Sequence, residues 1–483
     1  MGQYSEGSVS VVKPVRTLIL TLCTISLGYL ALAATRGDLR AQVESHHVVQ
    51  KDRRVELKTD LQFGPPKFPI SVATDNRHLV DATGTPFLLV GDAAWSLIAQ
   101  LKREDVEIYL QDRRARGFNA ILVNLIEHRF ASNAPANAYH AAPFLAPGAF
   151  DKPNEAYFAH ADWVIERASE LGFVVLLAPC YTGAGGGSEG WYQEMVASGA
   201  EKLRAYGRFV GERYSRFNNI IWVENGDSNP SNRDLVRAVA NGIYESDPNA
   251  LQTAHNATGT AGADLWEGEA WFKLNNVYTY GPVFPDARTQ YLRTPTMPFV
   301  LLESQYENGP DITPQRLRRQ AYQALLTGAT GQIFGNSPIW YFDGTGEYSA
   351  PAGWKKALDS PGARSMTRLR ELFTGLHLQD LVPDVDDQLL VGGVKSGHER
   401  AVAATSSDHR TTIVYFPEDR QITLRMAELA GTQVRAVWWD PVDSLAFEAS
   451  ESPFRAGVNA TFRPSAKNGG GDGDWILILS EEE

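Results

Sequence analysis

Carboxylate, amide and aromatic side chains gather where a series of apolar runs ends in this 483-residue chain. A carboxylic acid can donate a proton, and a carboxylate can attack an electrophilic carbon. Wide aromatic faces beside carboxylates suit a sugar ring, which stacks through its C–H face and hydrogen-bonds through its hydroxyls. The candidate site residues are Asp92, Trp95, Asn124, His128, Trp222, Glu224, Asp227, His255, Tyr280, Glu303, Tyr306, Asn336 and Trp340.

Asp227 and Glu303 are the leading catalytic candidates. Asp227 ends the fourth apolar run, and Glu303 directly follows two leucines in the seventh. Burying a carboxylate among apolar residues is costly, which favours a task for Glu303. Asp227 could instead cap the following helix, and Glu224 competes for the same role. Two carboxylates facing each other across a barrel mouth are enough to hydrolyse a glycosidic bond.

Two other candidates keep a structural alternative. Asp92 could cap a helix near Trp95 or bind sugar hydroxyls, and His255 could contact substrate or simply complete a strand end. A metal-dependent hydrolase of this architecture would need a His-x-His pair, and the ten histidines include none. We therefore expect no metal site, and cleavage by two carboxylates requires no organic cofactor.

Eight apolar runs alternate with helix-like segments in the central part of the chain. The expected strands cover residues 86–92, 119–126, 173–181, 219–227, 251–256, 273–280, 298–307 and 332–340. Helices are expected between them, for example over 103–116 and 157–171, each followed by Gly-Phe. Eight such alternations over about 260 residues match a (β/α)8 TIM barrel. A doubly wound sheet would need a Gly-x-Gly-x-x-Gly turn after its first strand, and residues 91–95 do not provide one.

The barrel domain is assigned to residues 69–383, with 71–80 as a hairpin that closes its floor. Short strands separated by Gly, Asp and Pro turns follow, with no comparable helical pattern. Residues 384–483 are therefore expected to form a small all-β sandwich domain. The fold class is α/β, a TIM barrel followed by this sandwich.

The N-terminal segment is typical of an export signal. Lys13 and Arg16 precede an apolar run that ends in Ala-Leu-Ala, so residues 1–34 are expected to be a signal peptide or an N-terminal membrane anchor. Residues 35–68 are polar and read as a linker. The resulting expectation is a monomer that is secreted, periplasmic or at the cell surface, with membrane contact through this segment only.

The composition of the chain limits the classes of molecule that it is expected to bind. The chain has 45 Lys and Arg against 57 Asp and Glu, a net charge of −12, whereas a nucleic-acid binder should carry a basic surface. Nucleic acid is therefore excluded as a partner, and a carbohydrate substrate is expected.

An ordered set of motifs resembles the apiosidase-like glycoside hydrolases of bacteria, a barrel of the family 140 type followed by a β domain labelled collagen-binding. The motifs are residues 87–95 (FLLVGDAAW), Trp222 with Gly226-Asp227, residues 303–309 (ESQYENG), Gly335 with Trp340, residues 438–441 (WWDP) and Asp474-Trp475. The resemblance implies a retaining hydrolase in which Asp227 is the acid/base and Glu303 the nucleophile. It also implies that Asp92 belongs to the floor of the sugar site.

The expected function is an exported glycoside hydrolase that acts on a poly- or oligosaccharide. The alternatives are a non-catalytic exported glycan-binding or adhesion protein on the same scaffold, and a transglycosylase that uses the same two carboxylates.

Overall fold

The structure is a computed structural model that describes residues 46–57, 64–344, 353–429 and 431–482. The expected signal peptide or anchor over residues 1–34 lies outside the described residues. Within the described part of the chain, no helix has both the length and the apolar character needed to cross a bilayer.

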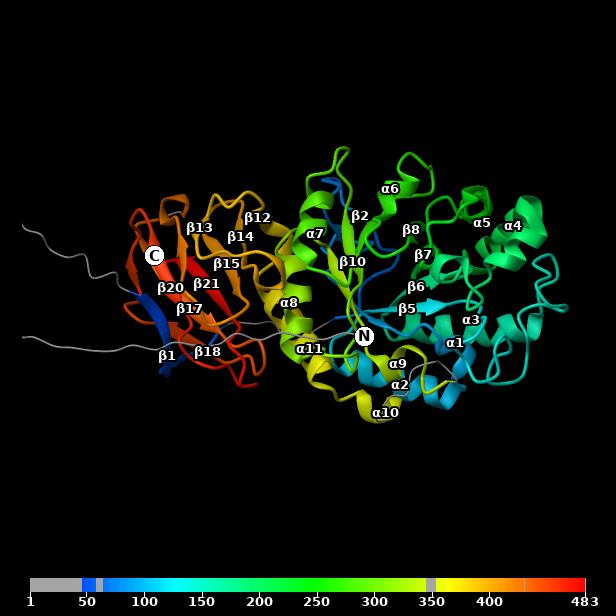
Figure 1. Ribbon diagram of the computed structural model, residues 1–483, viewed down its shortest axis with the longest axis horizontal. Coiled ribbons are helices and arrows are strands. Elements are labelled where there is room, and N and C mark those ends of the chain that lie inside the picture. Colours follow the sequence, from blue (N-terminus) through cyan, green and yellow to red (C-terminus); the bar gives the residue numbers. More distant parts are fainter. Residues whose placement is uncertain (1–45, 58–63, 345–352, 430, 483) are drawn as a thin grey trace, which may run out of the picture. The chain divides into compact units, whose positions relative to one another are not determined.

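Eight parallel strands form the central sheet, as the alternation of apolar runs predicts (Figure 1). They are β4 (Leu89–Ala93), β5 (Ala120–Asn124), β6 (Val174–Ala178), β7 (Ile220–Asn225), β8 (Leu251–His255), β9 (Asn275–Tyr278), β10 (Phe299–Glu303) and β11 (Gly331–Phe334). Neighbours in the sheet follow chain order, and β11 pairs with β4. At the remaining β8–β9 junction, the amides of Lys273 and Leu274 donate to the carbonyl of Gln252. The sheet is therefore a nearly closed barrel, and the predicted fold class is confirmed.

Helices connect and cover these strands. They are α1 (Leu97–Gln100), α2 (Arg103–Ala115), α3 (Glu155–Glu170), α4 (Tyr192–Tyr214), α5 (Arg233–Ser246), α6 (Gly262–Trp266), α7 (Val283–Tyr291), α8 (Pro314–Leu325), α9 (Ser337–Trp340), α10 (Trp354–Ala357) and α11 (Pro361–Gly375). Gly117 and Gly172 have φ of 80° and 79° at the ends of α2 and α3, which is the left-handed stop that the Gly-Phe pattern predicts. Thr313 caps α8 by accepting a hydrogen bond from the amide of Arg316, ahead of a proline at the first helical position.

A hairpin closes the amino-terminal end of the barrel. β2 (Ser71–Val72) pairs with β3 (Leu79–Val80), as expected for residues 71–80. Leu79 is fully buried and belongs to the same apolar cluster as Leu122, Leu176 and Val300, which fill the barrel interior. The opposite, carboxyl-terminal end of the barrel is therefore left for the site.

The C-terminal region is the expected β-sandwich. Its strands are β12 (Leu381–Pro383), β13 (Leu390–Gly392), β14 (Val402–Ser406), β15 (Thr411–Phe416), β16 (Ile422–Leu424), β17 (Gln433–Trp439), β18 (Ala446–Ala449), β19 (Phe454–Arg455), β20 (Ala460–Arg463) and β21 (Trp475–Glu481). Trp438, Trp475, Phe447 and Phe462 are buried together in its core.

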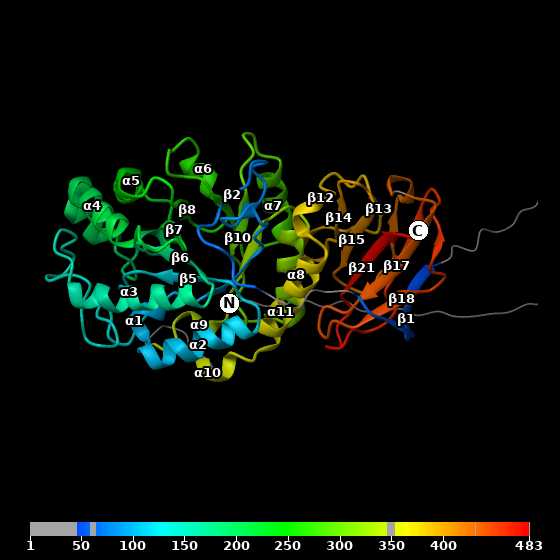
Figure 2. The same ribbon diagram turned by 180° about the vertical axis from the view of Figure 1, so that it is seen from behind.

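One further strand of the sandwich comes from the other end of the chain. β1 (His46–Val55) pairs antiparallel with β18 and parallel with β20, so it joins the two sheets of the sandwich (Figures 1 and 2). This corrects the expectation of a linker over residues 46–55. Residues 51–54 are exposed, which explains the polar sequence, whereas His47 and Val49 are buried.

Candidate active site

A cavity of about 560 Å³ opens at the carboxyl-terminal ends of the barrel strands. Aromatic side chains, carboxylates and amides share its wall. The lining residues are Trp95, Asn124, Arg129, Phe130, Tyr181, Ala184, Glu189, Asp227, Tyr280, Glu303, Gln305, Tyr306, Gly309, Pro310, Ile312, Ser337 and Trp340.

Asp227 and Glu303 both line this cavity, but their surroundings differ. The Asp227 side chain is 24% exposed and accepts a hydrogen bond of 2.8 Å from the Tyr181 hydroxyl. The Glu303 side chain is 7% exposed and accepts one of 2.6 Å from the Tyr280 hydroxyl. One carboxyl group is thus more open to the cavity, and the other is held more tightly within its wall.

His255 connects the two carboxyl groups. Its Nε2 lies 2.9 Å from Glu303 Oε2, and its Nδ1 lies 3.8 Å from Asp227 Oδ1. The backbone amide of Asp227 donates to Nδ1 at 3.0 Å. A nitrogen that accepts cannot carry a proton of its own, so the proton of the neutral ring is on Nε2 and is donated to Glu303.

A strained turn after β7 brings Asp227 to the cavity. Asn225 and Asp227 have φ of 70° and 49°, a region that side-chain-bearing residues seldom adopt. Between them, Gly226 has φ of 157°, and a Cβ there would lie 2.3 Å from the Tyr181 ring. Asn225 anchors the turn, because its amide group donates to the Asn256 side chain and accepts from Thr182.

A β-bulge directs Glu303 into the cavity. Leu301 pairs with Val277 and Glu303 with Tyr278, so two residues of β10 oppose one residue of β9. Leu302 faces the barrel interior and Leu301 the helical layer, so strict alternation would turn Glu303 outward. The extra residue reverses that orientation.

The pKa of Glu303 is raised from its ordinary value. Burial is the main cause, and the charge of Asp227 adds to it, whereas the hydrogen bonds from His255 and Tyr280 lower the pKa. Glu303 is therefore largely shielded from water, and the hydrogen bonds that it accepts from His255 and Tyr280 stabilise its ionised form.

Aromatic rings form much of the wall. Trp95 donates from Nε1 to the Tyr306 hydroxyl at 3.1 Å, and its ring meets His255 edge-on at 5.4 Å. Trp340 meets Phe130 edge-on at 5.0 Å. Gly335 leaves room for the Tyr306 ring, since a Cβ at this position would lie 2.6 Å from that ring.

The structure places Trp95, Asn124, Asp227, Tyr280, Glu303, Tyr306 and Trp340 at the cavity, as the sequence predicts. His255 lies directly beneath it, fully buried between the carboxyl groups. The Asn124 amide oxygen is buried and has no hydrogen-bond partner among the described residues.

Three candidate side chains on the strands point away from the cavity, so the prediction that they bind substrate is wrong. Asp92 is fully buried and accepts a hydrogen bond from Tyr109 of α2 at 2.9 Å, and burial raises its pKa to about 6 against the charge of Arg113. Trp222 packs against Tyr214 in the helical layer. Glu224, on the same face of β7, is fully buried away from the cavity, and burial raises its pKa well above the usual range.

Two further candidates lie beside the site rather than in it. His128 contacts Glu194 at 3.1 Å and Trp191 edge-on, and it does not reach the cavity. Asn336 is fully buried and donates to Glu307 and Ser360. Both side chains support the loops around the cavity.

The cavity residues that the candidate set omits come from loops. Three of them lie several residues after a strand end, namely Arg129, Phe130 and Glu189, and Gln305 lies two residues after the end of β10. No periodic pattern indicates where the side chains of such loop residues point. Tyr181 carried a usable signal, since it stands at the end of the third apolar run. No group of three metal-ligating side chains occurs within the described ranges.

The family comparison covers both parts of the chain. A family model described as the apiosidase-like catalytic domain matches residues 73–380. A second model, described as "Putative collagen-binding domain of a collagenase", matches residues 382–480. No curated protein matches the chain.

Solved structures share the fold. The crystal structure of a glycoside hydrolase family 5 from Bacteroides vulgatus ATCC 8482 is 23% identical with a TM-score of 0.74, and the match covers 86% of this chain and 93% of that one. A structure named glycoside hydrolase has the same identity and TM-score, and the match covers 86% of this chain and 99% of that one. Because the catalytic-domain model matches residues 73–380, well over half of the chain, the protein belongs to the apiosidase-like family of glycoside hydrolases.

Proposed function

We propose that the protein hydrolyses a glycosidic bond with retention of configuration, with Glu303 as nucleophile and Asp227 as acid/base. One observation carries the proposal: two carboxyl groups from opposite sides of the barrel line one cavity and both approach the ring of His255. Because both carboxyl groups approach one imidazole, they lie close enough together to act as a catalytic pair, and the choice of retention over inversion is part of the proposal.

In the first step, Glu303 attacks the anomeric carbon and the bond from that carbon to the leaving oxygen breaks. Asp227 gives its proton to the leaving oxygen, so the departing group leaves as an alcohol. The hydrogen bonds from His255 and Tyr280 hold the attacking carboxylate in place before substrate arrives.

In the second step, Asp227 is a carboxylate and takes a proton from water. The water oxygen bonds to the anomeric carbon, and the ester to Glu303 breaks and restores the free carboxylate. Two inversions at one carbon give net retention.

The difference in exposure supports this division of roles. A nucleophile must be fixed and desolvated, and Glu303 is 7% exposed and holds two hydrogen bonds. An acid/base must reach both a leaving group and a water molecule, and Asp227 is 24% exposed. The proposed substrate is a sugar residue of a larger glycan, stacked on the rings of Trp95 and Trp340.

Asp227→Asn and Glu303→Gln test the assignment. Each is expected to reduce turnover of 4-nitrophenyl glycosides and polysaccharides by at least about 10³-fold, with unchanged thermal unfolding. Glu224→Gln is the matched control, because this carboxyl group also belongs to β7 but is buried outside the cavity. NMR of the first-formed product should show the anomer of the substrate.

Azide separates the two roles further. With Glu303→Ala, azide should yield a glycosyl azide of inverted configuration, and with Asp227→Ala one of retained configuration. An inverted product from the wild-type protein would refute retention, and full activity of either isosteric variant would refute the assignment of that residue.

We also propose export, on the basis of the apolar run over residues 18–34. Fractionation of cells that express the full chain, with N-terminal sequencing, tests this: protein confined to the cytoplasm with an intact N-terminus would contradict it.

A further inference from the structure

Gln305 is a cavity residue whose orientation is set by a second side chain. It lines the cavity two positions after Glu303, and its Oε1 accepts a hydrogen bond of 2.9 Å from Nε of Arg316 in α8. Because the oxygen of the amide is occupied, the Nε2 group is the part left to interact with a ligand. Within the described part of the chain this Nε2 group has no hydrogen-bond partner.

Arg316 is in turn held by the β domain. Its Nη2 donates to Nε2 of His398, which lies in the short helical turn η3 (Gly397–Glu399) between β13 and β14. Burial is the main reason that the pKa of His398 is lowered to about 4, and the charges of Arg316 and Arg319 contribute to the same shift. His398 is therefore neutral at physiological pH and can accept this hydrogen bond.

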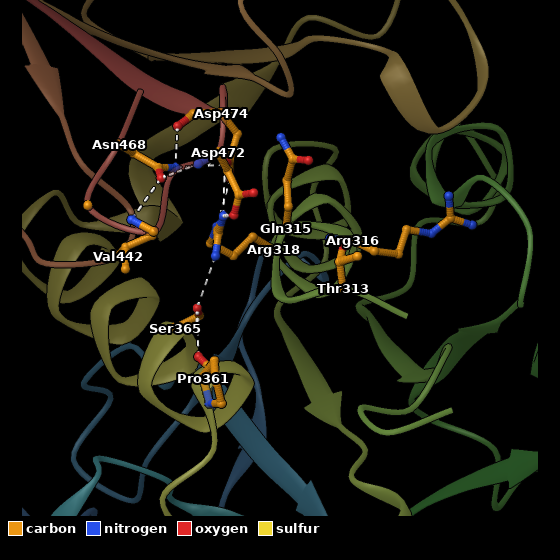
Figure 3. Close-up of polar contacts among 12 residues, drawn as sticks. Thr313, Gln315, Arg316, Arg318, Pro361, Ser365, Val442, Asn468, Asp472 and Asp474 are labelled. Carbon is orange, nitrogen blue, oxygen red and sulfur yellow. Dashed lines mark hydrogen bonds and ion pairs between the residues drawn. The ribbon is translucent and has the colours of Figure 1, made fainter. Parts of the chain in front are cut away.

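Helix α8 itself is clamped to the β domain on its other side. Arg318 donates to both oxygens of Asp474, at 2.7 and 2.8 Å, and to Asp472 at 2.7 Å (Figure 3). The Arg318 and Asp474 side chains are 2% and 0% exposed. Figure 3 shows the Arg316 side chain extending from the opposite side of the helix to Arg318. The helix therefore cannot move relative to the β domain without breaking a buried ion pair.

The same helix also holds the backbone of the cavity segment. Gln320 donates from Nε2 to the hydroxyl of Ser304 at 3.0 Å and to the carbonyl of Gln305 at 3.3 Å. Both the main chain and the side chain of Gln305 are thus positioned from α8.

We propose that Gln305 is a substrate-binding residue that donates its amide N–H to an oxygen of the glycan, and that His398 of the β domain is its positioning residue, acting through Arg316. This assigns the β domain a part in substrate binding by the catalytic cavity. The inference rests on the proposed function, since it places substrate in the cavity with Asp227 and Glu303.

Steady-state kinetics of four variants test the chain of contacts, with the 4-nitrophenyl glycoside that the wild type hydrolyses fastest. Gln305→Glu keeps an acceptor for Arg316 but has no N–H to donate, so KM should rise about tenfold while kcat changes little. His398→Leu removes the acceptor for Arg316 and should raise KM in the same way. His398→Gln can present an amide oxygen to Arg316 and should restore the wild-type KM.

Arg319→Ala is the matched control. Arg319 lies on the same helix and donates to the carbonyl of Pro417 in the β domain, at 3.1 and 2.8 Å, but it does not contact Gln305. Its KM should therefore stay at the wild-type value. Thermal unfolding of each variant shows whether it is folded, and Gln305→Glu tests the substrate contact even if His398→Leu does not fold.

An unchanged KM in Gln305→Glu would overturn the substrate contact, and an equal rise in KM for Arg319→Ala would overturn the specific path through His398. Neither result would affect the catalytic assignment, which depends on Asp227→Asn and Glu303→Gln. Conversely, full activity of those two variants would remove the proposed function whatever the Gln305 variants do.

Discussion

At the scale of single residues, the direction of a side chain separates the catalytic candidates from the structural ones. Asp227 and Glu224 stand three residues apart on the same chain segment, yet only Asp227 lines the cavity. Glu224 lies on the same face of β7 as Trp222, and this face is directed toward the helical layer. Successive residues of a strand point to opposite faces, so residue type alone does not distinguish them.

Removing a donor to Glu303 should move the pH dependence of the reaction. Glu303 must be ionised to attack, so kcat/KM falls as the pH falls through its pKa. Tyr280→Phe removes a hydrogen bond that lowers this pKa, so the pKa should rise and the acid limb of the profile should shift to higher pH. Measurement of kcat/KM between about pH 3 and pH 9 checks the shift.

Tyr181→Phe is the control for this shift, because Tyr181 donates to Asp227 instead. Its acid limb should remain at the wild-type pH. A Tyr280→Phe profile that superimposes on the wild type would show that Glu303 does not govern the acid limb.

At the scale of elements, the positions of the two proposed catalytic side chains depend on departures from regular structure. The bulge in β10 turns Glu303 inward, and the positive-φ turn after β7 presents Asp227. Regular strands would supply a stable barrel but would point Glu303 away from the cavity. The irregular ends of the strands therefore position the proposed catalytic residues, while the regular centres form the barrel.

Gly226→Ala should impair catalysis by moving Asp227. The new Cβ would overlap the ring of Tyr181, which holds the Asp227 carboxyl group. A displacement of about 1 Å at a reacting group costs roughly 10²-fold in rate, so a loss of that order in kcat is expected. Enzyme kinetics and a thermal melt measure the effect.

Gly259→Ala separates steric displacement from backbone strain. Gly259 also has a positive φ, of 77°, but a Cβ there meets no atom within 4 Å. This variant should lose some stability and retain kcat. Equal losses of kcat in the two variants would argue against displacement of Asp227 as the cause.

At the scale of the whole molecule, the β-sandwich is built from two parts of the chain that lie on either side of the barrel in the sequence. β1 precedes the barrel in sequence and completes the sandwich that follows it. Helix α8 then ties the sandwich to the segment that lines the cavity, through Arg318 and Arg316. Within residues 45–483, which form one compact unit, the β domain is therefore structurally part of the catalytic protein.

A chain that begins at residue 64 should be less stable than one that begins at residue 45. It loses the strand that joins the two sheets of the sandwich and exposes the surface that Val49 covers. Burial of one valine contributes about 2 kcal/mol to stability, and the lost backbone pairing adds to this, so the Tm should fall. Calorimetry of the two chains makes the comparison, and equal Tm values would show that β1 does not stabilise the sandwich.

The barrel, the sandwich and the two leading carboxylate candidates could be predicted from the amino-acid sequence. Runs of apolar residues and their spacing are local properties, and burial on both faces of a parallel sheet leaves a direct mark on them. Asp227 and Glu303 could be selected because polar residues at the carboxyl ends of barrel strands meet at one mouth.

The sequence could not predict which side chains enter the cavity or which segments pair, because both depend on contacts between distant parts of the chain. The outward placement of Asp92, the bulge that turns Glu303 inward and the pairing of β1 each depend on a neighbour distant in sequence. The same is true of the path from His398 through Arg316 to Gln305. The direction of a side chain and the pairing of a strand are set by contacts between elements. Such contacts produce no periodic pattern in the sequence.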